Sequence, residues 1–403
     1  MKRSRIDSFI MQQEGLESLS RDIIRAIQLK KLNRLLSLEK ERNGYYRDLP
    51  ACLKSLDELA TLPFTTDETL AHQAGQLLLL SQSRIRRVLS DATSGTTGAA
   101  KRVFYTEADL ENTVRLYRAG LGELVFPGDR VMICFPFSGP QGLGELIAEA
   151  VSRLGAAPLK LGCGLSYGEY ADVMEREKPD CFVGMPVQLL SLLRVCSRGS
   201  LRRALVSGDA CPDAVIHCCE DLLGSRLFPH YGSREMGMAG AITCPAHAGM
   251  HLRENDIIAE IVDGYGRVLP EGEFGELVIT TIGMEALPLI RYRTGDYTRV
   301  LPGVCPCGSE VLRLDSVTRL GQEQEMARLD GAVFTLEEVV DCRVKLDGAA
   351  CAVEALVRDT LSAARLTAAV KSVFPEREVS VSIRSVLPED HALYPGKRVC
   401  LSS

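Results

Sequence analysis

Short apolar runs and helical patterns alternate through the middle of this chain, and this alternation constrains its fold most. The apolar runs have the length and composition of buried strands, and they lie at 131–135, 157–161, 181–184 and 204–207. Apolar residues recur at helical spacing between them, over 143–154, 167–177 and 187–195. Alternating strands and helices pack as a parallel sheet covered by helices on both faces. We therefore predict an α/β fold.

The pattern changes in the last third of the sequence. Short strands at Ile257–Val262, Glu276–Thr281 and Thr298–Leu301 are separated by turn residues and indicate a small antiparallel subdomain. Beyond residue 319 we expect a helix at Leu336–Val340 and a strand at Val379–Ile383, in a small α+β lid. The predicted division is a large domain over 1–318, β-rich from about 240, and a lid domain over 319–403.

Composition excludes several classes of protein. A net charge of −6 with 46% hydrophobic residues is that of a soluble protein without nucleic-acid or anionic-membrane partners. The basic start of the chain is not followed by the apolar core of a signal peptide, so we expect a cytoplasmic protein. In that compartment the 14 cysteines should be thiols or metal ligands.

A loop rich in glycine and hydroxyl side chains runs from Thr93 to Lys101. Glycines let backbone N–H groups approach a phosphate, hydroxyls add donors, and Lys101 adds positive charge. The spacing is not that of a Walker loop, so a P-loop NTPase is not indicated.

Together with three later segments, this loop resembles the adenylate-forming superfamily. Residues 230–235 are similar to the family's Y-G-x-[ST]-E motif, residues 291–296 to its Y-R-T-G-D motif, and 395–398 to the segment with its late lysine. Further matches at 62–66, 288–290 and 305–308 identify the phenylacetate–CoA ligase-like branch, and the resemblance runs from about residue 29 to about 334. It implies a fold of parallel sheets, a β subdomain and a small lid.

The resemblance also implies a role for each motif in forming an acyl-adenylate from ATP. The implied catalytic residues are Lys397, which would bridge the carboxylate and the α-phosphate, Glu235, which would contact Mg²⁺, and Lys101. Tyr231 would pack on adenine and Asp296 would accept hydrogen bonds from the ribose, whereas Arg293 would either hold phosphate or pair with Asp296. The implied nucleotide-binding residues also include Thr93, Ser94, Gly95, Thr96, Thr97, Gly98, Gly232 and Ser233.

Two short cysteine-containing motifs supply the ligands of a closed structural zinc site. Cys244 and His247 form a Cys-x-x-His pair, with two residues between them. Cys305 and Cys307 form a Cys-x-Cys pair, with one residue between them. His251 is an alternative to His247, which we rank first because Cys-x-x-His closes on one metal more easily. Relatives in the branch carry a similar arrangement, and reduced buried cysteines are the alternative.

The carboxylic acid is expected among loops that follow the predicted parallel strands. The candidate residues are Phe137, Gly142, Met185, Ser207 and Asp209. Phe137 and Met185 indicate an apolar wall, and Asp209 would either read a polar group of the acid or cap the next helix.

The identity of the acyl acceptor depends on motifs in the last part of the chain. The resemblance favours CoA, and family members are often dimers. The family's hinge aspartates and its R-G-x-N-[VI]-F-P run are missing after residue 318, however. A carrier-protein thiol or an amine as acceptor, and a nucleotide-binding regulator without turnover, therefore remain alternatives.

Overall fold

The structure is a computed structural model that describes the chain except residues 1–2, 92–99, 197, 395 and 403. It divides into two compact units that each combine separate stretches of sequence. The first unit is Met1–Glu123 with His230–Ser316, and the second is Leu124–Pro229 with Val317–Ser403. The predicted division at residue 318 into a large domain and a lid stays a prediction.

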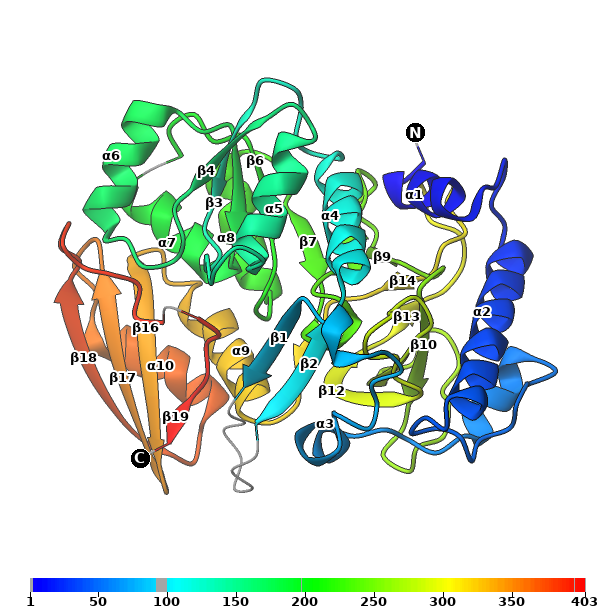
Figure 1. The fold of residues 1–403 in the computed structure, drawn as a ribbon. Helices are drawn as coiled ribbons and strands as arrows, with labels where there is room; N and C mark the ends of the chain where they lie inside the picture. Colours follow the sequence, from blue (N-terminus) through cyan, green and yellow to red (C-terminus); the bar gives the residue numbers. More distant parts are fainter. Residues whose placement is uncertain (1–2, 92–99, 197, 395, 403) are drawn as a thin grey trace. The chain divides into compact units, whose positions relative to one another are not determined.

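The second unit contains the parallel sheet that the sequence predicts. Its strands pair in the order β4-β3-β5-β6-β7, all parallel, with helices between consecutive strands (Figure 1). Its first ten elements in chain order are β3 (Arg130–Ile133), α5 (Leu143–Ser152), β4 (Ala157–Lys160), α6 (Tyr167–Glu177), β5 (Cys181–Gly184), α7 (Pro186–Cys196), β6 (Arg203–Val206), α8 (Asp213–Leu223), β7 (Phe228–Tyr231) and β15 (Thr318–Arg319). Strand β5 is buried at all four positions, as expected for a strand covered on both faces.

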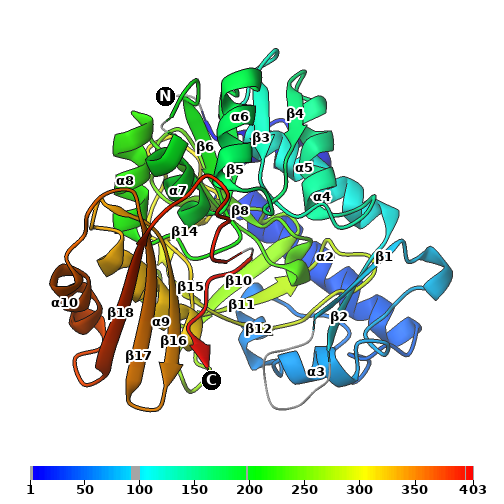
Figure 2. The same cartoon turned by 90° about the vertical axis from the view of Figure 1, so that its left-hand side faces the viewer.

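The C-terminal part of the second unit is α+β, as predicted. Strand β17 pairs with β16 antiparallel and with β18 parallel, and the three strands lie side by side in Figure 2. The elements are α9 (Gln322–Val333), β16 (Val339–Asp347), β17 (Ala350–Val357), α10 (Ala363–Val373), β18 (Glu378–Ser385) and β19 (Leu401–Ser402). The predicted helix at Leu336–Val340 is wrong, because the β-branched pair Val339 and Val340 begins β16 and the helix ends before it, at Val333.

This C-terminal part shares one hydrophobic core with the parallel sheet and its helices. The buried side chain of Arg194 in α7 donates to the carbonyl oxygen of Phe334 at 2.7 Å, and Ser191 donates to that of Val340 at 2.7 Å. At the start of α6, the N–H groups of Tyr167 and Gly168, which have no partner within a helix, donate to the carbonyl oxygens of Asp390 and Pro388. Main-chain bonds and buried side chains therefore fix residues 317–403 within this unit.

In the first unit the strands pair antiparallel. Strands β10 and β11 lie where the sequence predicts strands and pair antiparallel, and β12 pairs antiparallel with β11. The predicted third strand at Thr298–Leu301 is wrong in its bounds, because β12 already begins at Tyr292 and ends at Thr298, and a separate strand covers Val300–Leu301. The last two residues of β7 pair with β8, which pairs with β9, and β14 and β13 follow. The elements are α1 (Arg5–Glu14), α2 (Arg21–Glu41), α3 (Asp67–His72), β1 (Arg87–Asp91), β2 (Lys101–Tyr105), α4 (Glu107–Leu121), β8 (Ala241–Thr243), β9 (Met250–Leu252), β10 (Ile257–Val262), β11 (Gly275–Thr281), β12 (Tyr292–Thr298), β13 (Val300–Leu301) and β14 (Arg313–Leu314).

Among the described residues, no helix has the length and apolar character needed to cross a membrane.

Candidate active site

Lys101 and Glu235 form a buried ion pair in the first unit. Lys101 is the first residue of β2, and Glu235 lies in a 3₁₀ turn, Arg234–Met236, just after β7. The Lys101 Nζ lies 2.8 Å from the Glu235 Oε1, and these side chains are 14% and 8% exposed. The structure therefore brings Lys101, at the end of the predicted phosphate-binding loop, next to Glu235, at the end of the Y-G-x-[ST]-E motif. The predicted phosphate-binding residues Thr93, Ser94, Gly95, Thr96, Thr97 and Gly98 lie outside the described residues.

Two residues that sequence reasoning missed complete this cluster. The Lys101 Nζ also lies 3.1 Å from Asp67 Oδ1 and 3.1 Å from the Tyr292 hydroxyl. Tyr292 donates to Asp67 and contacts Glu235 Oε1 at 3.3 Å. The signal for Tyr292 was its place inside the Y-R-T-G-D motif, and Asp67 directly follows the Leu62–Thr66 match.

A main-chain pairing holds these two added residues together. Thr65 forms a parallel bridge with Tyr292, in which the Thr65 N–H donates to the Arg291 carbonyl oxygen at 3.0 Å and the Arg293 N–H donates to the Thr65 carbonyl oxygen at 2.9 Å. The segment that precedes α3 is thus fixed against the start of β12, although more than 200 residues separate them in sequence.

The cluster keeps both members of the ion pair charged. Burial alone would lower the pKa of Lys101, but the charges and hydrogen bonds of Glu235 and Asp67 outweigh burial and raise it. Burial alone would raise the pKa of Glu235, but Lys101 outweighs burial and lowers it. The site therefore presents an ammonium group beside an ionised carboxylate, with little access for water.

Tyr231 and Asp296 form a second pair of predicted residues. The Tyr231 hydroxyl at the end of β7 donates to Asp296 Oδ2 in β12 at 2.6 Å. Gly232 follows Tyr231 where a Cβ atom would lie 2.8 Å from the Met238 carbonyl oxygen, so only glycine fits this turn. Ser233 comes next and accepts the Met238 N–H through its carbonyl oxygen at 2.8 Å. The turn thus leads directly from Tyr231 to Glu235.

Arg293 has a partner that neither predicted alternative included. Its Nε donates to Glu276 Oε2 in β11 at 2.9 Å, so the predicted pairing with Asp296 is wrong. The cause is the register of the sheet, in which β12 lies antiparallel beside β11 and brings Glu276 next to this arginine. The neighbouring Arg291 is 2% exposed and pairs with Glu260 at 3.0 Å, as a structural residue would.

The residues expected to bind the acid all belong to the second unit. Phe137 and Gly142 follow β3, Met185 follows β5, and Ser207 and Asp209 follow β6, so all five lie beyond the carboxyl ends of neighbouring parallel strands. Ligands of open α/β sheets bind at such edges. The Asp209 carboxylate accepts the N–H groups of Ala210 at 2.8 Å and of Arg398 at 2.9 Å. The predicted alternative of a helix cap is wrong, because the residue that caps α8 is Pro212.

Lys397 also belongs to the second unit. Its side chain is 53% exposed and lies 3.5 Å from Glu323 in α9. The adjacent Arg398 is 5% exposed, so the chain turns from solvent into the core between these two residues.

The cysteine motifs meet in the first unit, but with a different histidine from the one ranked first. Cys244, His251, Cys305 and Cys307 are all buried, and their ligand atoms lie within 4.8 Å of one another. His251 is in β9, which pairs with both β8 and β14, and this pairing carries its ring to the cysteines. His247 is not in the cluster, because it takes a left-handed conformation in the turn between β8 and β9. Its ranking above His251 is therefore wrong.

The distances within this cluster fit a tetrahedral metal ion. Ligand atoms 2.0–2.3 Å from zinc lie roughly 3.5–3.8 Å apart. The Sγ atoms of Cys244 and Cys305 are 3.8 Å apart, and the Cys307 Sγ is 3.7 Å from His251 Nε2. Three thiol groups and one imidazole are also the donor set of closed structural zinc sites.

Comparison with known proteins finds a matching family and several relatives of this chain. The sequence profile of a family described as AMP-binding enzyme matches residues 92–285. A phenylacetate–coenzyme A ligase of Aromatoleum evansii is 31% identical over 346 residues, which cover 79% of this chain and 74% of the relative. This chain belongs to the phenylacetate–CoA ligase-like branch of the adenylate-forming enzymes. A second relative in this branch is a phenylacetate–coenzyme A ligase of Thermus thermophilus. It is 28% identical over an alignment that covers 96% of this chain and 90% of the relative.

The fold of this adenylate-forming enzyme also matches solved structures. A 2-hydroxyisobutyryl-CoA ligase in its postadenylation state aligns with a TM-score of 0.76 and 20% identity, over 93% of this chain and 89% of that one. The predicted class, an α/β adenylate-forming fold, is thereby confirmed.

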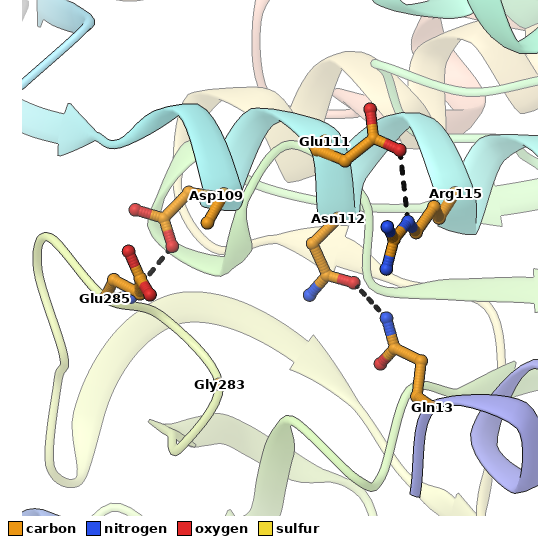
Figure 3. A pocket seen from close by; sticks show the side chains of 8 residues that line it. Gln13, Asp109, Glu111, Asn112, Arg115, Gly283 and Glu285 are labelled. Atoms are coloured by element: carbon orange, nitrogen blue, oxygen red, sulfur yellow. Dashed lines mark hydrogen bonds and ion pairs between the residues drawn. The ribbon is translucent and has the colours of Figure 1, made fainter. Parts of the chain in front are cut away.

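A hollow elsewhere in the first unit contains none of the adenylate-forming motifs. It lies beside α4, and the side chains that line it are bonded to neighbouring groups (Figure 3). Gln13 donates to Asn112 at 2.6 Å, Arg115 to Glu111 at 3.1 Å, and the main chain of Glu285 to Asp109 at 2.8 Å.

Proposed function

We propose that this adenylate-forming enzyme activates an aryl or medium-sized carboxylic acid with ATP and passes the acyl group to CoA. An oxygen of the carboxylate attacks the α-phosphorus, and pyrophosphate leaves. The thiol sulfur then attacks the acyl carbon, and AMP leaves. Two relatives named phenylacetate–coenzyme A ligases support both the acid and the acceptor.

The observation that carries the proposal is the meeting of two predicted pairs in one unit. Lys101 and Glu235 are 2.8 Å apart, and Tyr231 and Asp296 are 2.6 Å apart. An ammonium group and an ionised carboxylate suit the phosphates of a nucleotide and its Mg²⁺, because both stabilise charge in a site with little water. The ring of Tyr231 would pack on adenine, and Asp296 would accept from the ribose hydroxyls.

The remaining roles follow from the same chemistry. Lys397 would place its charge between the carboxylate and the α-phosphate, where negative charge develops. Phe137 and Met185 would line the acid. Cys244, His251, Cys305 and Cys307 would hold a structural Zn²⁺ with no open position, so the metal would fix the loops around β9 and take no part in the reaction.

Acid-dependent exchange of pyrophosphate into ATP, measured without an acceptor, tests the first half-reaction. We expect exchange with phenylacetate or a related aryl acid. Release of AMP after addition of CoA then tests the second half. An adenylate that forms but is not discharged by CoA would favour a carrier-protein thiol or an amine, in line with the missing hinge residues. Nucleotide binding with no exchange for any acid would overturn the proposal in favour of a regulator.

A further inference from the structure

The chain segment that carries Lys397 is held by a buried charge cluster around the next residue, Arg398. The guanidinium of Arg398 contacts Asp330 in α9 through two bonds of 2.8 and 2.9 Å, and Asp341 in β16 through one of 2.8 Å. It also donates to the Cys342 carbonyl oxygen at 2.9 Å. Asp330 and Asp341 are 3% and 2% exposed. A planar guanidinium with these partners has one orientation, so the position of Arg398 in the unit is fixed.

Aromatic rings close the remaining sides of this guanidinium. The Arg398 side chain lies 4.7 Å from the ring centre of Tyr394 and 5.4 Å from that of Phe334. The Tyr394 hydroxyl donates to the Val399 carbonyl oxygen at 2.9 Å. The residue that follows Arg398 is thereby held by one of the same side chains.

The main chain of Arg398 has a separate partner on another element. Its N–H donates to Asp209 Oδ2 at 2.9 Å, and Asp209 lies in the loop after β6. This loop is the one in which Ser207 and Asp209 are expected to meet the acid. Apart from this bond, Asp209 accepts the N–H of its own neighbour Ala210.

We propose that Asp209 is a positioning residue, whose carboxylate ties the segment of Lys397 to the acid-binding loop that follows β6. The bond sits on the peptide unit that joins Lys397 to Arg398, so it fixes the carbonyl end of the Lys397 backbone. The lysine side chain itself is 53% exposed and lies 3.5 Å from Glu323. The inference rests on the proposed function, since it needs Lys397 to act in adenylation.

The test compares Asp209→Ala with Asp209→Asn in the full chain by acid-dependent pyrophosphate exchange over a range of ATP and acid concentrations, so that kcat and both KM values are obtained. The Ala variant loses the acceptor, and we expect kcat to fall by about 10- to 100-fold, since a catalytic group misplaced by about 1 Å costs up to that factor. The KM for ATP should stay within about twofold. The Asn variant keeps one acceptor oxygen and should recover most of the rate.

A double variant separates positioning of Lys397 from other roles of Asp209. If Asp209 acts through Lys397, then Asp209→Ala should cause no further loss in a Lys397→Ala background. Asp180→Ala is the matched control, because Asp180 also accepts a distant main-chain N–H, that of Arg130 at 3.0 Å, and it precedes β5 at the opposite end of the sheet. We expect its exchange rate to equal that of the wild type.

Three results would overturn the inference. One is an Asp209→Ala enzyme with unchanged kcat, and another is a double variant whose loss is the product of the two single losses. The third is a change confined to the KM for the acid, which would mean that Asp209 reads the substrate. If Asp209→Ala fails to fold, Asp209→Leu removes the same acceptor oxygens while filling the volume of the side chain, and an unchanged kcat in that variant would overturn the inference. The wild-type enzyme separates the proposed function from the proposed role of Asp209. If the wild type shows no pyrophosphate exchange, the proposed function itself is refuted.

Discussion

At the scale of single residues, the candidate site depends on charges that are kept ionised by their neighbours. Glu235 is buried, and the ammonium group of Lys101 offsets the cost of burying it. Removing Lys101 takes the cation away from the buried Glu235, whereas removing Glu235 leaves Lys101 beside Asp67. The Asp209 carboxylate oxygens, by contrast, accept two main-chain N–H groups, those of Ala210 and Arg398.

We predict that Glu235→Gln lowers adenylation by about 10²–10³-fold, because one preorganised group at a site of developing charge is worth about 3–4 kcal/mol. The fall should be measured by pyrophosphate exchange over a range of Mg²⁺ concentrations. If Glu235 contacts the metal, the half-saturating Mg²⁺ concentration should rise as well. An unchanged Mg²⁺ dependence would contradict that role. Glu273→Gln removes an exposed carboxylate from the turn before β11 and serves as the comparison.

A second prediction at this scale concerns pH. Burial raises the pKa of Asp209 from its ordinary value of 3.8 to about 6. Between these values the folded state holds a proton that the unfolded state has lost, so this group makes the protein less stable as pH rises from about 4 to about 6. Urea unfolding at intervals across this range should show the trend in the wild type and a smaller one in Asp209→Asn. Equal trends in both proteins would refute the raised pKa.

At the scale of elements, strand pairing decides which side chains meet. The pairing of β9 with β8 and β14 brings His251 to the three cysteines, while the turn before β9 carries His247 out of the cluster. The pairing of Thr65 with Tyr292 likewise adds Asp67 and Tyr292 to the ion pair. In both cases a pairing between segments of the chain brings a residue to the cluster, and local spacing did not rank that residue first or did not indicate it at all.

The two histidines give a direct prediction about the metal. We expect purified protein to contain one zinc ion per chain. His251→Ala should lose it and melt at a lower temperature, because the binding energy of a structural zinc contributes to folding. His247→Ala should keep both the metal and the melting temperature. Metal analysis and calorimetry measure these effects, and loss of zinc in His247→Ala but not in His251→Ala would refute this ligand set.

At the scale of the whole molecule, the predicted chemistry is divided between two units built from interleaved stretches of the chain. Lys101, Glu235, Tyr231 and Asp296 belong to the first unit, and Lys397 belongs to the second. Nucleotide binding and acyl activation should therefore be separable by substitution.

We predict that Lys397→Ala binds ATP with an affinity close to that of the wild type but exchanges pyrophosphate about 10²–10³-fold more slowly, the effect of a lost charge worth about 3–4 kcal/mol. Titration calorimetry and the exchange assay measure the two quantities. Lys371→Ala, which removes another lysine of the second unit from α10, is the control and should change neither. An exchange rate of Lys397→Ala near that of the wild type would refute the role of Lys397.

The sequence by itself determined the α/β class, the positions along the chain of strands β3, β4, β5 and β6, and the antiparallel strands β10 and β11. It also determined the motifs of the adenylate-forming family. These features rest on local periodicity and on short runs of residues, which can be read without knowing distant neighbours. Only the tertiary structure decided that His251 joins the cysteines, that Arg293 pairs with Glu276, and that Asp209 holds the main chain of Arg398. Each of these depends on the register between segments that are far apart in sequence, and local spacing carries no information about register.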